Sequence, residues 1–116
     1  MYAKLDINNN VTEFDNITYE EASELLEKLE NTNPKFFDFQ IEDYDSSFMQ
    51  FMKENGIINV CIGTHTENDE LYCRYAPYDY LISFTLLEDA LDDFFNGSTD
   101  MPYFDWDENL DDYIKL

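Results

Sequence analysis

The residues with the most distinctive chemistry lie in the last third of the chain, where acidic and aromatic side chains are interleaved. Ten carboxylates fall between Glu88 and Asp112, and this stretch contains no lysine or arginine. Like charges four residues apart on a helix cost a few tenths of a kcal/mol each. A stretch that served only as a solubilising face would be expected to intersperse lysines. Aromatic anchors beside charged groups are typical of protein-binding surfaces, so we expect this stretch to bind a basic partner.

The residues expected to contact this partner are exposed acids and rings near the end of the chain. They are Asp100, Tyr103, Asp105, Asp107 and Glu108. A second acidic rim is expected from two other turn-like regions, and it comprises Asp43, Tyr44, Asp45, Glu67, Asp69 and Glu70. Trp106 fits either a partner anchor or a core residue, and we favour the core.

The overall charge narrows the class of partner. The chain has 27 acidic and six basic residues, which gives a net charge of −21. Contacts to nucleic-acid phosphates need lysine and arginine, and the six basic residues here are scattered. Direct binding to nucleic acid is therefore not expected, and neither is binding to an anionic membrane. The implied partner is a basic protein.

Length and composition predict one folded domain over residues 1–116. Such an acidic chain could be disordered if it lacked apolar surface, but 17% of its residues are aromatic. Each large ring buries roughly 150–250 Å², which is enough to build a core. The amino-terminal residues lack a signal-peptide pattern and no apolar run is long enough to span a membrane. We expect a cytoplasmic protein, with Cys61 and Cys73 reduced and packed as small core residues.

Two patterns that could indicate a metal or catalytic site fail on inspection. Alternate oxygen-bearing residues at 105, 107, 109 and 111 are similar to a calcium loop. Leu110, however, stands where that loop needs glycine, and Leu116 stands where it needs a bidentate glutamate. His65 is the only histidine, and no phosphate-binding loop or nucleophile motif accompanies it. We predict no cofactor, no metal, no catalytic residues and no enzymatic activity.

Hydrophobic periodicity and turn residues predict the elements that position these groups. Capping boxes at Thr18–Glu21 and Thr85–Glu88 indicate two helices, one over 19–31 and one ending near Gly97. Asn55-Gly56 favours a hairpin turn. The predicted strands are 2–7, 37–42, 47–54, 57–63, 71–75 and 80–84. This order predicts an α+β fold, with an antiparallel sheet of about five strands and two main helices packed on it.

One region of the chain also carries a family resemblance. A strand running into an amphipathic helix, Phe84-Thr85-Leu86-Leu87-Glu88-Asp89-Ala90-Leu91-Asp92-Asp93-Phe94-Phe95, is followed by Gly97, Pro102 and a late Trp106. Residues 84–106 thereby resemble the type-1 immunity-protein family of bacterial polymorphic toxin systems, which includes immunity proteins against secreted DNA cytosine deaminases. The chain departs from this family in a longer connection over 96–101 and a more acidic tail. The resemblance implies packing roles for Ala90, Phe94, Phe95 and Trp106.

These observations support two main hypotheses of function. The first is an immunity protein that binds and neutralises a cognate bacterial toxin stoichiometrically, the toxin having a basic cleft for nucleic acid. The second is a phage-encoded DNA mimic that inhibits a defence nuclease, of the anti-restriction or anti-CRISPR type. A weaker third is an acidic scaffold for a basic secreted protein.

Overall fold

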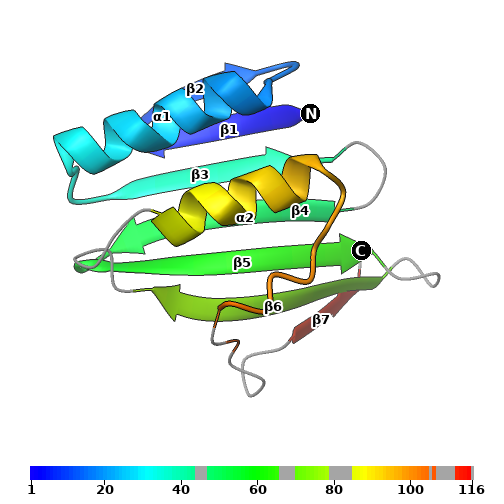
Figure 1. Cartoon of the computed structure of the whole chain (residues 1–116). Helices are drawn as coiled ribbons and strands as arrows, with labels where there is room; N and C mark the ends of the chain where they lie inside the picture. The colour runs from blue at the N-terminus through cyan, green and yellow to red at the C-terminus, as the bar shows by residue number, and fades with distance from the viewer. Residues whose placement is uncertain (44–46, 66–69, 79–84, 105, 107–111, 116) are drawn as a thin grey trace.

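Seven strands form one antiparallel sheet, and two helices lie on one of its faces (Figure 1). The computed structural model describes residues 1–43, 47–65, 70–78, 85–104, 106 and 112–115. Within these residues the strand order is β2-β1-β3-β4-β5-β6-β7. The elements are β1 (Tyr2–Ile7), β2 (Asn10–Phe14), α1 (Tyr19–Thr32), β3 (Phe37–Glu42), β4 (Ser47–Glu54), β5 (Ile57–His65), β6 (Glu70–Tyr78), α2 (Thr85–Phe95) and β7 (Asp112–Lys115). The predicted α+β class is confirmed, with more strands than the expected five.

The two additional strands lie at the edges of the sheet. Asn8 and Asn9 both have positive φ angles, 49° and 72°, as a tight hairpin turn requires, and they return the chain into β2. Four of the five β2 residues are exposed, so β2 lacks the apolar alternation by which strands are recognised. At the other edge, β7 pairs with β6. The strand expected over 80–84 lies outside the described residues.

The helix ends follow the local signals in the sequence. The Thr18 hydroxyl accepts a hydrogen bond from the Glu21 amide at 3.2 Å, and the Glu21 carboxylate accepts one from the Thr18 amide, which confirms the first capping box. At the end of α2, Gly97 has a φ of 88°. Its amide donates to the Phe94 carbonyl, and the Ser98 amide donates to the Asp93 carbonyl. This pair of bonds is a Schellman motif, so Gly97 is the predicted C-cap.

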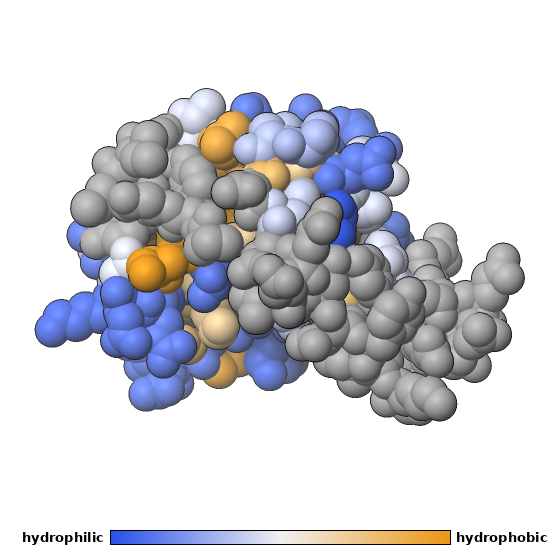
Figure 2. Space-filling model, turned by 90° about the horizontal axis from the view of Figure 1, so that it is seen from below, coloured by the Kyte–Doolittle hydropathy of each residue, from blue (hydrophilic) through white to orange (hydrophobic). Residues whose placement is uncertain are grey.

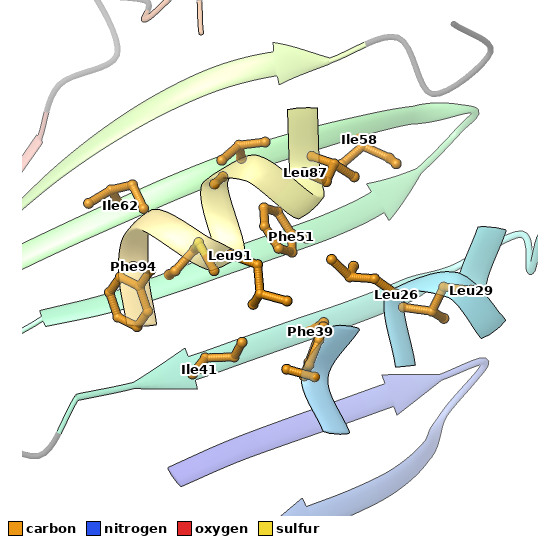
Figure 3. Packing of buried hydrophobic residues seen from close by; sticks show 14 of the residues in the cluster. Leu26, Leu29, Phe39, Ile41, Phe51, Ile58, Ile62, Leu87, Leu91 and Phe94 are labelled. Atoms are coloured by element: carbon orange, nitrogen blue, oxygen red, sulfur yellow. The ribbon is translucent and has the colours of Figure 1, made fainter. Parts of the chain in front are cut away.

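The core lies between the helices and the sheet. One row of directly paired residues crosses five strands, and all of its members are buried: Leu5, Phe39, Phe51, Val60 and Ala76. Leu26 and Leu29 of α1 and Leu87, Leu91 and Phe94 of α2 point toward this face (Figure 3). Burying each such side chain contributes about 1.5–3 kcal/mol. No described helix covers the opposite face of the sheet.

On that opposite face, the ring of Phe48 in β4 lies over Gly63 in β5. The two residues are directly paired, and a Cβ atom added to Gly63 would lie 2.1 Å from Phe48 Cε1. Position 63 therefore requires glycine, because the Phe48 ring occupies the space that the Cβ of any other residue would take.

This contact predicts a change of sign in a double-mutant cycle. In the wild type, Gly63→Ala should lower the free energy of unfolding by about 1–3 kcal/mol, because it overpacks the site. In a Phe48→Ala background the space is open, and Gly63→Ala should stabilise the protein by about 0.5 kcal/mol, since alanine is less costly than glycine in a strand. Urea denaturation of the four proteins measures the coupling. Equal effects of Gly63→Ala in both backgrounds would contradict the assignment.

Candidate partner-binding surface

The acidic side chains of α2 lie on its outer surface because its apolar residues are turned inward. Leu87, Ala90, Leu91 and Phe94 are buried against the sheet. Helical spacing then directs the remaining positions away from the core. Asp89 and Asp92 are exposed, while Glu88 and Asp93 are half-buried. Four carboxylates thus follow the outside of α2, which contains no basic residue.

Tyr103 binds to this row of carboxylates. Its hydroxyl donates a hydrogen bond to Asp93 Oδ2 at 2.7 Å, and its ring packs against Phe104 with centroids 5.1 Å apart. Partial burial, this hydrogen bond and the charges of Asp93, Asp89 and Asp92 raise the pKa of Tyr103 above its ordinary value. The phenol therefore stays neutral and remains a donor. The sequence predicted Tyr103 as a contact residue, and the structure places its hydroxyl against Asp93 of α2.

Arg74 of β6 holds the segment that carries Tyr103. Its Nη2 atom donates to the carbonyl oxygens of Thr99 and Asp100. Its guanidinium carbon lies 4.5 Å from the centre of the Trp106 ring, a distance at which a cation is attracted to the ring face. This role of Arg74 was not predicted, because only the pairing of Arg74 with Ile62 shows that its side chain points to the helix side of the sheet.

Trp106 is held within the chain on several sides. Its Nε1 donates to the Met101 carbonyl at 2.9 Å, and its ring meets that of Phe104 edge to face at 5.6 Å. It is half-buried and packs against the core. Met101 and Phe104 are themselves buried. Trp106 therefore packs against the core beside Arg74 of β6 and holds the segment before it.

Of the remaining predicted contact residues, three lie within the described part of the chain and the others lie outside it. Asp100 is exposed in the segment that Arg74 holds, and the half-buried Asp43 donates its amide to the Ser47 carbonyl at 2.8 Å where β3 turns into β4. Glu70 begins β6. The structure thus places Asp100 and Tyr103 in one segment next to α2. The others, Tyr44, Asp45, Glu67, Asp69, Asp105, Asp107 and Glu108, lie outside the described residues.

A second row of carboxylates on α1 adds to the surface, and the sequence analysis did not include it. The two helices run antiparallel side by side (Figure 1), and Tyr19 meets Phe95 edge to face at 5.9 Å. Lys28 is the only basic residue in either helix. We call the acidic residues of these two helices the acidic helix layer; they are Glu20, Glu21, Glu24, Glu27, Glu30, Glu88, Asp89, Asp92 and Asp93.

Other kinds of site receive little support from the described residues. Among them, no three His, Cys, Asp or Glu side chains are grouped as a metal site would require, and no helix combines the length and apolarity needed to cross a membrane. Cys61 and Cys73 are both buried as free thiols, and burial together with Cys73 raises the pKa of Cys61 to about 12. Viewed from below, much of the described surface is hydrophilic, with smaller apolar areas between (Figure 2).

Comparisons of the chain with protein-family models, with curated proteins and with solved structures find no match.

The Arg74 contacts predict that the sole tryptophan reports on this segment. Arg74→Met should lower the free energy of unfolding by about 2 kcal/mol, since it removes a cation–ring contact and two charge-assisted hydrogen bonds. Trp106 emission should shift to longer wavelength as the ring becomes hydrated. The free energy of unfolding and the emission wavelength of Arg74→Lys should lie between those of the wild type and of Arg74→Met, because lysine keeps the charge but lacks the guanidinium fork. Lys4→Met, at an exposed position of β1, is the control. An emission spectrum unchanged in Arg74→Met would refute the stacking.

The Tyr103–Asp93 hydrogen bond predicts a pH-dependent stability difference. Because the fold raises the pKa of Tyr103, the bond contributes fully below the ordinary tyrosine value of 10.0 and is lost as pH rises above it. At pH 7, Tyr103→Phe should cost about 1 kcal/mol, a modest value because the side chain is 36% exposed. Urea denaturation of both proteins from pH 7 to 11 should show the difference shrinking above pH 10. A constant difference would argue against the bond.

Proposed function

We propose that this chain is an immunity protein that binds a cognate bacterial toxin in the cytoplasm of the producing cell and neutralises it. The observation that carries the proposal is the acidic helix layer, in which nine carboxylates share two adjacent helices with one lysine. This concentration is costly for stability alone, since like charges at helical spacing repel. A protein partner with a basic cleft would neutralise it. The resemblance of residues 84–106 to type-1 immunity proteins points to a toxin as that partner.

The surface combines the two properties that inhibition by occupancy requires. Long-range attraction between opposite charges raises association rates, up to about 10⁸–10⁹ M⁻¹s⁻¹ at low salt. Slow release needs fixed anchors rather than mobile charges. Tyr103 is such an anchor, because its ring rests on Phe104 and its hydroxyl is bound to Asp93. Toxins that act on nucleic acid have basic clefts, so the acidic helix layer would occupy the place of phosphates.

A matched pair of charge reversals tests which surface is used. Asp89→Lys/Asp92→Lys alters two exposed positions of α2, and Glu13→Lys/Glu54→Lys alters two exposed positions of the sheet. Both variants raise the net charge by four. The α2 variant should associate with the toxin about tenfold more slowly, or slower still, at low salt. It should also fail to rescue the growth of cells that express the toxin. The association rate and the growth rescue of the sheet variant should fall far less.

The toxin for this test is identified by affinity capture from the source organism, followed by growth rescue on co-expression. Equal effects of the two double variants would show that only net charge matters and would refute the α2 surface. The DNA-mimic alternative predicts a different pattern, in which the chain competes with DNA for several unrelated DNA-binding proteins. Such broad competition, without protection against one toxin, would overturn the immunity proposal.

A further inference from the structure

The outer side of β2 is an open edge of the sheet within the described part of the chain. β2 ends the strand order on that side (Figure 1), and it pairs with β1 at each of its five positions without a bulge. Natural edge strands discourage further pairing with lysine, proline or a bulge. β2, with the sequence Asn-Val-Thr-Glu-Phe, has none of the three. Another strand can therefore pair with this edge.

The turn before β2 decides which of its backbone groups point outward. Two asparagines with positive φ form a two-residue turn, and in such a hairpin the flanking pair, Ile7 with Asn10, exchanges both backbone hydrogen bonds. Bonded pairs alternate with non-bonded pairs, so Thr12 is bonded to β1. Val11 and Glu13 therefore direct their amide and carbonyl groups away from β1. Among the described residues, no hydrogen bond of these outward groups is found.

A second copy of β2, antiparallel and related by a two-fold axis at Thr12, satisfies all of these outward groups. Val11 of each copy then lies opposite Glu13 of the other, and each such pair exchanges both backbone bonds. An axis at Val11 or at Glu13 would leave the other of these two residues without a partner in the strand. An axis at Glu13 would also place like charges directly opposite each other, which is destabilising. With the axis at Thr12, no two charged side chains are opposed, and Val11, which is 53% exposed, gains a neighbour.

Basic residues offset part of the acidic charge at this edge. Lys4 of β1 is exposed and directly paired with Glu13. On α1, Tyr19 faces α2 through its contact with Phe95, and Lys28 follows Tyr19 by about two and a half helical turns. Lys28 therefore lies on the side of α1 that is turned away from α2, toward β2 (Figure 1). Two copies that approach through this edge meet less repulsion than they would at α2, which has no basic residue.

We propose that two copies of this chain associate through β2, antiparallel about Thr12, so that one sheet continues across both copies. The proposal does not rest on the function proposed above, because β2 is not part of the acidic helix layer. A five-residue strand makes a small interface, of the weak class that buries less than about 1,200 Å². The net charge of −21 on each copy opposes association, and salt screens this repulsion. The expected behaviour is a monomer–dimer equilibrium that shifts toward dimer as salt is added.

Sedimentation velocity of the whole chain over a series of protein concentrations tests the association. The runs are made in sodium chloride at about 0.01 M and about 0.15 M, between which the screening length falls from about 30 Å to about 8 Å. The dimer fraction should rise with protein concentration, and more steeply at the higher salt. Hydrogen exchange of the Val11 and Glu13 amides should slow as dimer forms, while that of the Thr12 amide, already bonded to β1, should not change. A monomer at every concentration in both salts would overturn the proposal.

A pair of charged variants tests the two-fold axis. Thr12 is exposed, so the fold should tolerate both changes, which urea denaturation checks. Thr12→Lys places like charges opposite each other at the axis and should weaken association about fivefold, although it makes the net charge less negative. Thr12→Glu should also weaken association. An equal mixture of the two variants should recover it as a heterodimer, because opposite charges then meet at the axis.

The control for net charge is Glu54→Gln, at an exposed position of β4. It changes the net charge by the same amount as Thr12→Lys and should associate at least as well as the wild type. Association of Thr12→Lys that equals or exceeds that of the wild type would overturn the proposal. A mixture of the two Thr12 variants that associates no better than either alone would also overturn it. None of these outcomes depends on whether a toxin partner exists.

Discussion

The burial of one face of the sheet is the constraint on which the rest of the structure depends. The row from Leu5 through Phe39 and Phe51 to Ala76 is apolar, and it must be covered for the sheet to be stable. Two helices and the segment around Phe104 supply that cover. Each helix turns its apolar side to the sheet, so its carboxylates must face solvent. The acidic helix layer is therefore a direct consequence of how the core is closed.

Local signals made much of this fold predictable, and non-local pairing accounts for what was missed. The Thr18 capping box, the Asn55-Gly56 turn and the Gly97 C-cap each act within a few residues, so the sequence alone located both helices and the central hairpin. β2 has no apolar alternation because four of its five residues are exposed at the edge. β7 is defined by its pairing with β6, which no local pattern reports.

The same distinction applies to the candidate site. Helical spacing is enough to direct the α2 carboxylates outward once the apolar residues face the core, and composition singled out Tyr103. The bond from Tyr103 to Asp93 spans ten residues, and the role of Arg74 depends on the register of β6 with Ile62 of β5. Register places Arg74 at the end of an otherwise apolar row. Without knowledge of that register, Arg74 is only one of six scattered basic residues.

Arg74 and Lys53 together show how the charge is divided between the inside and the outside of this molecule. Both occupy inward-facing strand positions, and each binds a carbonyl or amide oxygen that ends a segment: Arg74 at Thr99 and Asp100, Lys53 at Asn33. These cations fix the ends of the helix layer, where a helix or tail must be held to the sheet. They act from beneath the layer, so Lys28 is the one basic residue on the helices that carry its carboxylates. By placing two of its six bases beneath the helices and nine carboxylates on them, the protein keeps its fold while presenting a strongly negative surface to a partner.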